Sequence, residues 1–223
     1  MSAQVFLFIL LLSLVVFTVP KSFKYYFSLA VLTACVILSS VWSIEVLFGN
    51  SSEIKITSQL PFILKTFNLI IDRLSAFFII VVNITVFVGF IYARGYLKPY
   101  YKSKNSLRFS IHFFSYLWLY FSMIMVVMIR NGLSFLIVWE IMALSSFMLV
   151  IFDAEETTIM KTGISYLIQM HVGMFFLMIA FLIVDRETGE MGFDALRLYF
   201  SNHSNLFLFI LFFIGFGIKA GFI

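Results

Sequence analysis

Long, uninterrupted runs of apolar residues separated by short polar connections dominate this chain. A helix needs about 20 residues to cross a hydrocarbon core of about 30 Å, and runs near that length recur along the whole sequence. Because the runs are continuous rather than alternating, they favour helices over the strands of a barrel. The pattern predicts an all-α, polytopic transmembrane helix bundle in a single membrane domain, 1–223, with about seven helices, the last one truncated: 4–19, 23–48, 74–93, 110–129, 133–152, 162–184 and 206–223.

The polar connections between these runs carry structural signals of their own. The connection at 49–73 includes SSEIKITSQLP, whose alternation is typical of a short strand or hairpin. The connection at 185–205 combines acidic residues with spaced aromatic and apolar ones, which favours a short helix resting on the membrane interface. Residues 130–132 form a very tight connection, which predicts that the flanking helices are antiparallel neighbours.

Composition supports the membrane assignment and narrows the chemistry. The chain is 62% hydrophobic and 12% charged, whereas soluble domains average about 25% charged. The formal charge of +4 does not indicate a nucleic-acid partner, because the basic residues lie beside the apolar runs and loop topology explains them better. Cys35, the only cysteine, lies inside the second run, which excludes an intrachain disulfide and cysteine-ligated iron–sulfur or zinc clusters. We therefore expect no cofactor in this chain.

Lysine and arginine in the short connections predict the orientation. Two lysines lie in the first connection and five basic residues in the third, so the positive-inside rule places both connections in the cytoplasm and the amino terminus outside. The first run has no basic segment before it and is followed at once by a second run, which indicates a retained helix rather than a cleaved signal. The basic residues in question are Lys21, Lys24, Arg94, Lys98, Lys102, Lys104 and Arg108.

Two charges stand in the middle of apolar runs, Glu140 in the fifth and Lys219 in the seventh. A charge at a helix centre costs roughly 2.5–3.5 kcal/mol on insertion scales, so such residues are functional candidates by default. Leu136 and Leu144 share the helix face of Glu140, and neither neutralises it. In the predicted topology the fifth and seventh helices run parallel, and a lysine stem covers much of the roughly 9 Å between the two levels. We expect the two residues to pair.

Whether the pair is static or active is a separate question. A buried ion pair stabilises a fold only weakly, because desolvation offsets the attraction, so a proton-transfer role is the better explanation. His171 lies in the sixth run, and its ordinary pKa near 6.5 suits a relay between carboxylate and lysine; a hydrogen bond that packs two helices together explains it equally well. For Ser146 and Tyr166, helix packing is the favoured interpretation.

Four segments resemble one known family. IIDRLSAFFIIVV, RNGLSFLIVWEIMALSSFMLV, KTGISYLIQMHVG and GFGIKAG are similar, in this order, to motifs of the antiporter-like proton-translocating membrane subunits. These subunits occur in respiratory complex I, in multisubunit sodium/proton antiporters and in membrane-bound hydrogenases. The histidine and glycine of the sixth run and the Lys-Ala-Gly sequence look most similar to the hydrogenase 4 and formate hydrogenlyase branch, with complex I chains close behind.

The resemblance implies a fold and a site. It implies the first part of an inverted-repeat, antiporter-like fold, and since the second repeat is missing we expect an amino-terminal fragment. Glu140 and Lys219 match the glutamate and lysine thought to drive proton movement in the family, and His171 is carried over as a further proton-transfer residue. Implied partners are other membrane subunits of a respiratory or hydrogenase complex and the lipid bilayer, in a prokaryotic inner membrane.

The function that follows is a proton-translocating membrane subunit of a redox-coupled complex, hydrogenase 4-like or NADH:quinone oxidoreductase-like. The chain itself shows no nucleophile with a base, phosphate loop or metal cluster, so we expect an oxidoreductase subunit without its own catalytic centre. A structural membrane anchor or assembly subunit, and a secondary sodium/proton antiporter subunit, are the alternatives. The choice between protons and sodium, and the electron donor and acceptor, stay open at this stage.

Overall fold

The computed structural model describes residues 11–49, 53–57, 68–153, 157–202 and 205–222. It confirms the all-α membrane bundle: five helices are long and apolar enough to cross a membrane, and a shorter apolar helix follows them. The predicted helix 4–19 lies partly outside the described residues, which begin at Leu11 in that region. The long helices are α2 (Lys24–Phe48), α3 (Arg73–Leu97), α5 (Ser106–Met128), α6 (Gly132–Val150) and α7 (Thr157–Thr188), and the shorter one is α9 (Leu206–Lys219).

Short elements join the long helices. A 3-10 turn, η1 (Val15–Phe17), precedes α2, and another, η3 (Ile151–Asp153), extends α6. The 49–73 connection contains the expected hairpin pairing, because β1 (Ile54–Thr57) and β2 (Asn68–Ile71) form an antiparallel pair. The expected short helix in the 185–205 connection is α8 (Phe193–Asn202), and a single turn, α4 (Tyr100–Ser103), separates α3 from α5.

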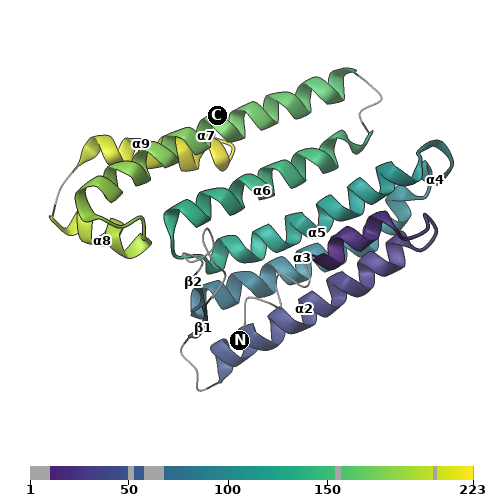
Figure 1. Ribbon diagram of the computed structural model, residues 1–223, viewed down its shortest axis with the longest axis horizontal. Helices are drawn as coiled ribbons and strands as arrows, with labels where there is room; N and C mark the ends of the chain where they lie inside the picture. Colours follow the sequence, from purple (N-terminus) through teal and green to yellow (C-terminus); the bar gives the residue numbers. More distant parts are fainter. Residues whose placement is uncertain (1–10, 50–52, 58–67, 154–156, 203–204, 223) are drawn as a thin grey trace.

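The long helices form a row in chain order. Figure 1 shows α2, α3, α5, α6 and α7 side by side, each antiparallel to the next, with α9 lying along α7. Because α6 and α9 both start at the end where α8 lies, these two helices run in the same direction (Figure 1). This parallel relation is what allows a side chain near the end of α9 to approach the middle of α6.

Side-chain caps define where four of these helices begin. A free helix N-terminus leaves its first backbone N–H groups without partners, and an Asp or Asn side chain satisfies one of them. In each case the carboxylate or amide oxygen accepts a hydrogen bond from the backbone nitrogen three residues later, at 2.8–3.1 Å. The capping pairs are Asp72 with Ser75, Asn105 with Arg108, Asn131 with Ser134, and Asn205 with Leu208.

Several helix ends differ from the boundaries expected from hydropathy. Helix α7 extends beyond 162–184 at both ends. Polar residues can continue a helix there, because each added residue forms a backbone hydrogen bond whether or not its side chain is apolar. Helix α9 ends at Lys219 although the apolar sequence continues. Gly221 takes a positive φ of 80°, and Phe222 N donates to Gly217 O at 2.9 Å, a glycine-based termination of the last turn.

The tight turn between α5 and α6 ties one end of the bundle together. Arg130 forms an ion pair with Asp72 at the start of α3, and Arg130 O accepts from Phe193 N at 3.1 Å. Partial burial alone would raise the pKa of Asp72, but hydrogen bonds from Ser75 and the Arg130 guanidinium hold that pKa below its ordinary value. Leu69 of β2 bridges to Ile129 in the same turn. The hairpin, α3, α5 and α8 therefore meet at this turn.

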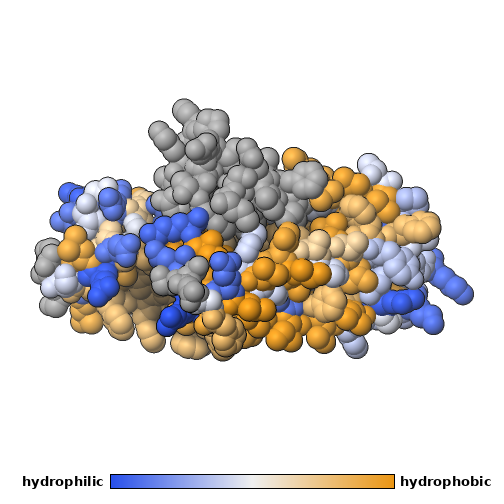
Figure 2. All heavy atoms as spheres, turned by 90° about the horizontal axis from the view of Figure 1, so that it is seen from below, coloured by the Kyte–Doolittle hydropathy of each residue, from blue (hydrophilic) through white to orange (hydrophobic). Residues whose placement is uncertain are grey.

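The surface of the bundle is apolar along the helices. In Figure 2, seen from the α2 side, the hydrophobic surface follows the lengths of the helices and the hydrophilic patches gather toward their ends. Large apolar side chains such as Ile44 of α2 and Ile84 of α3 are more than half exposed, which water would disfavour and lipid accommodates. Aromatic rings fill part of the interior, with Tyr25 stacked on Phe90 at 5.3 Å.

A polar network is buried among α2, α3 and α5. Asn83 Nδ2 donates to Ser39 Oγ at 2.9 Å and to Ser40 Oγ at 2.8 Å, and Tyr120 Oη donates to Asn83 Oδ1 at 2.9 Å. Asn83 and Tyr120 are each only 2% exposed. Since hydrogen bonds between membrane helices hold neighbours in register, this network fixes the first three long helices relative to one another.

Candidate functional site

Glu140 lies in the middle of α6 and is largely withdrawn from the surface. Its side chain is 12% exposed. The start of α6 is fixed by the Asn131 cap and by a close approach at Gly132, where an added Cβ would stand 2.5 Å from the ring of Phe181. This fit against α7 sets the position of the carboxyl group eight residues further along the helix.

Lys219 reaches Glu140 from the last turn of α9. Its Nζ donates to Glu140 Oε1 at 2.9 Å, and the lysine side chain is fully buried. The two residues that the sequence singled out, 79 positions apart, are therefore in direct contact. Because the acid and the amine lie on different helices, any movement of α9 against α6 changes the strength of their attraction.

Glycines bring α9 close enough to α7 for this contact. An added Cβ at Gly215 would stand 2.7 Å from the side chain of Leu177 and 3.0 Å from Gly173 O. An added Cβ at Gly173 would stand 3.1 Å from Gly215 O and 3.2 Å from Lys219 Cγ. Small residues at such crossings let membrane helices approach closely, so Gly173 and Gly215 position the lysine stem.

His171 of α7 lies against the other oxygen of the same carboxyl group. Its Nε2 is 3.3 Å from Glu140 Oε2, and its Nδ1 is 2.8 Å from the backbone oxygen of Leu167, one turn earlier on α7. The imidazole is 43% exposed, much more than the side chains of Glu140 and Lys219. The structure thus brings together all three residues that the sequence predicted, with one basic group at each oxygen of Glu140.

Trp139 is a member of the site that reasoning about charges missed. Lys219 Nζ lies 4.9 Å from the centroid of the Trp139 ring, within the range of a cation–π interaction. The ring of Phe216 packs 5.6 Å from Trp139 on the α9 side. The ammonium group therefore lies between a carboxylate and an aromatic face. The sequence carried no signal for this contact, because residues i and i+1 on a helix do not share a face; the crossing of α9 over α6 is what places the ammonium group beside both Trp139 and Glu140.

The hydroxyl groups near the site connect α6 to α7. Ser146 and Tyr166 are 2.7 Å apart, and Ser146 Oγ donates to Ala143 O at 2.9 Å. These contacts agree with the helix-packing role favoured for both residues.

Two lysines assigned to connections are in fact buried. Lys24, at the start of α2, is 0% exposed, and its Nζ donates to Val16 O at 2.7 Å and to Ser110 Oγ at 2.6 Å, both neutral oxygens. Lys104 is 8% exposed, with its Nζ 3.4 Å from Asp153 Oδ1. Hydropathy cannot predict this burial. A charged residue beside an apolar run is assigned to a loop whether or not neighbouring segments cover its side chain. Both lie outside the Glu140 cluster.

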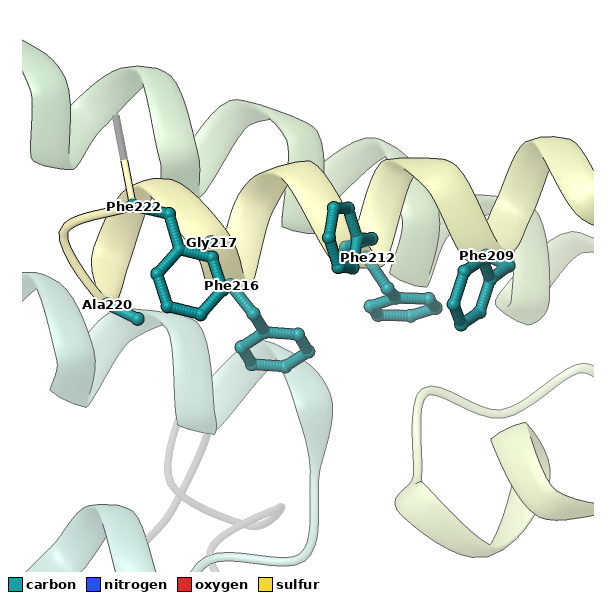
Figure 3. Close-up of a pocket in the computed structure, with 7 residues that line it drawn as sticks. Phe209, Phe212, Phe216, Gly217, Ala220 and Phe222 are labelled. Carbon is teal, nitrogen blue, oxygen red and sulfur yellow. The ribbon is translucent and has the colours of Figure 1, made fainter.

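An apolar recess of about 310 Å³ opens on the side of α9 and does not contribute titratable groups (Figure 3). Phenyl rings and small residues line it, and the rings of Phe209, Phe212 and Phe216 lie along one flank of the helix (Figure 3). Its chemistry suits hydrocarbon rather than protons. Among the described residues there is also no group of three or more His, Cys, Asp or Glu side chains that could hold a metal ion.

Comparisons with known proteins all match this chain to membrane proteins of respiratory, hydrogenase or antiporter type. A family model described as "NADH:quinone oxidoreductase/Mrp antiporter, TM" matches residues 129–223, a segment that includes Glu140, His171 and Lys219. Hydrogenase-4 component B of Escherichia coli (strain K12) is 34% identical over 163 residues, which are 72% of this chain and 23% of that protein. The chain thus spans about a quarter of the length of this relative.

The fold is also similar to a solved structure. A chain of the membrane-bound sulfane sulfur reductase, an archaeal respiratory membrane complex, superposes with a TM-score of 0.71 over 95% of this chain and 41% of that one. The sequence identity is 16%, so this likeness is one of fold.

Proposed function

The chain belongs to the antiporter-like family of membrane subunits, and from this premise we propose that it translocates protons in a redox-coupled membrane complex through the buried pair of Glu140 and Lys219. The observation that carries the proposal is the 2.9 Å contact between a fully buried ammonium group and a carboxyl group that is 12% exposed, on two different apolar helices. Residues of this kind inside a membrane are rare and commonly serve proton relays.

The placement of the pair favours a switched interaction over a static one. Removing two ions from water costs several kcal/mol each, and their attraction repays that cost only when the geometry is good, so folding alone gives little reason to keep them. Opening the contact would leave Glu140 and Lys219 each uncompensated, which favours proton uptake by the carboxylate and proton release by the ammonium. The pair therefore couples helix position to protonation.

Trp139 and His171 each act on one member of the pair: Trp139 contacts Lys219, and His171 contacts Glu140. The Trp139 face offers Lys219 a second, weaker stabilising contact at 4.9 Å, which holds the cation in place when Glu140 is neutral. His171 offers Glu140 a proton donor and acceptor at 3.3 Å, and its 43% exposure leaves the imidazole open to internal water or to a neighbouring subunit of the complex. We propose that His171 exchanges protons between such a group and Glu140.

The setting of the pair belongs to the same proposal. We propose that the amino terminus lies outside and that the connections rich in lysine and arginine lie in the cytoplasm of a prokaryotic cell, on the positive-inside pattern. We further propose that other membrane subunits of a hydrogenase 4-like or NADH:quinone oxidoreductase-like complex supply the redox energy. The similarity to Hydrogenase-4 component B supports the hydrogenase branch.

The test is proton translocation by the full complex in sealed vesicles, measured as the pH change that accompanies electron transfer. Glu140→Gln and Lys219→Met should each abolish proton movement while the complex assembles. Matched controls are Glu187→Gln and Lys161→Met, which make the same chemical changes at exposed positions of α7 and should leave translocation unchanged.

Two other outcomes would replace the proposal. Normal translocation in both site variants, with normal assembly, would mean that the pair only packs helices and that the chain is a structural anchor. Sodium-dependent transport that needs no redox partner would identify a secondary sodium/proton antiporter.

A further inference from the structure

The ring of His171 is held in one tautomer by its own helix. Nδ1 lies 2.8 Å from Leu167 O, and a backbone carbonyl oxygen can only accept a hydrogen bond. Nδ1 must therefore carry a proton whenever this contact is present. It follows that Nε2 is the nitrogen that gains or loses a proton when the ring changes charge.

Nε2 faces an oxygen that lacks a hydrogen bond. Glu140 Oε2 is buried and has no hydrogen-bond partner among the described residues, while Nε2 of His171 is 3.3 Å away. If both atoms were bare they would present lone pairs to each other, and a buried acceptor without a donor costs about 1–3 kcal/mol. A proton on either atom converts this repulsion into a hydrogen bond.

Lys219 does not supply this proton, because its Nζ donates to the other oxygen, Oε1. Other titratable side chains on the elements packed against α6 and α7 have different partners or lie at the surface. Five of them are hydrogen-bonded elsewhere: Tyr166 to Ser146, Tyr116 to Val86 O, Tyr120 to Asn83, Asp153 to Tyr100 and Tyr199 to Asn205. The ring of His112 packs on Phe152, and Asp185 lies near the end of α7. The exposed ones are Lys161, Arg186, Glu187, Asp194 and Arg197.

We propose that the contact between Glu140 and His171 closes only when a single proton lies between Oε2 and Nε2, and opens when that proton leaves. Within the closed contact, transfer breaks the Nε2–H bond and forms an Oε2–H bond, and the electron pair of the broken bond stays on Nε2. When the proton leaves to water, both atoms keep their lone pairs and repel. The exposed edge of the imidazole allows it to turn away from Glu140.

The consequence for the site is a change of one unit of charge. With Lys219 charged and the proton present, the three side chains carry a net charge of +1, and without that proton they carry zero. The meaning of this change for transport rests on the proposed function, but the tautomer and the shared proton rest on the geometry of His171 alone.

The experiment is nitrogen-15 NMR of histidine-labelled full-length protein in lipid bilayers between pH 5 and pH 9. The His171 signals are assigned by their loss in His171→Gln, and His112 serves as an internal control because it has no contact with Glu140. We expect neutral His171 to carry its proton on Nδ1 at every pH, so that protonation of the ring moves the Nε2 signal much further than the Nδ1 signal. In Glu140→Gln the side-chain amide donates to Nε2 and supplies no proton that can be shared, so the protonated fraction of His171 should be lower than in the wild type at the same pH.

A neutral His171 with its proton on Nε2 would overturn the inference, and this reading needs no variant. An unchanged protonated fraction in Glu140→Gln, with an unchanged His112 signal, would also overturn it. Translocation decides the proposed function separately. If translocation needs Glu140 while His171 shows the other tautomer, only the shared proton fails; if NMR agrees but no proton is pumped, only the transport role fails.

Discussion

Replacing Lys219 alone should destabilise the protein far more than replacing Lys219 and Glu140 together. Lys219→Met keeps the length of the buried stem and removes the charge, which leaves Glu140 in a site that is 12% exposed without its ammonium partner. Adding Glu140→Gln removes the stranded charge and keeps the shape of the carboxyl group. The comparison therefore separates the attraction of the pair from the volume that it fills.

The separation of the charges sets the magnitude. At the 2.9 Å between Nζ and Oε1 and an effective dielectric constant of 20, the attraction is about 6 kcal/mol before desolvation is subtracted. Breaking a buried pair by removing one partner costs about 3–5 kcal/mol, whereas exchanging both partners for neutral groups is often nearly neutral. We expect Lys219→Met to lower the free energy of unfolding by about 3–5 kcal/mol and the double variant to recover at least about 2 kcal/mol of that loss.

The assay is reversible unfolding of the full-length protein in mixed detergent micelles, followed by circular dichroism. Lys161→Met and Glu187→Gln, at exposed positions of α7, should each change the free energy of unfolding by less than about 0.5 kcal/mol. If the losses of Lys219→Met and Glu140→Gln simply add in the double variant, the two side chains do not interact and the reasoning is refuted.

Three further outcomes test other parts of the structure. Gly215→Val adds a branched side chain where even a single Cβ would stand 2.7 Å from the side chain of Leu177. Helix α9 should therefore shift away from α7, the free energy of unfolding should fall by about 1–3 kcal/mol, and proton translocation should fall with it. A stability equal to that of the wild type would contradict the close approach. Because the pKa of Asp72 is lowered in the folded state, its contribution to stability is present above the ordinary aspartate pKa of about 3.9 and is lost as the pH falls through the folded value. Asp72→Asn should therefore flatten the acid side of the plot of unfolding free energy against pH. An unchanged plot would contradict this. Tyr120→Phe removes the donor to Asn83 and should cost about 0.6–2 kcal/mol in the same unfolding assay, with no effect on translocation per assembled complex; a loss of translocation would assign the network to the proton path instead.

Hydropathy was sufficient to predict the class of fold, because lipid demands long apolar helices whose backbone groups are satisfied internally. The same demand made Glu140 and Lys219 visible in the sequence, since a charge in hydrocarbon needs a partner. Their contact was predictable because the number of intervening spans makes α6 and α9 parallel. Short polar signals were also informative: Asn131 and Gly132 predicted the turn, and the structure has it.

Side-chain directions were beyond the reach of the sequence. The Trp139 ring lies beside Lys219 only because α9 crosses α6 at this height, and no periodicity encodes that crossing. The single available tautomer of His171 depends on its rotamer, which brings Nδ1 to Leu167 O. The burial of Lys24 depends on the segment before α2, which supplies Val16 O, and on α5, which supplies Ser110 Oγ from 86 positions away. Each of these follows from packing between helices rather than from the pattern within one.

The most direct test of the central claim is the infrared difference spectrum of the whole complex in lipid, recorded between its oxidised and reduced states. We predict a band from a carboxyl group that changes protonation with the redox state. It should disappear in Glu140→Gln, shift in Lys219→Met and persist in Glu187→Gln. A difference spectrum that is the same in Glu140→Gln as in the wild type would show that Glu140 keeps one charge throughout, and would contradict a switched acid–amine pair.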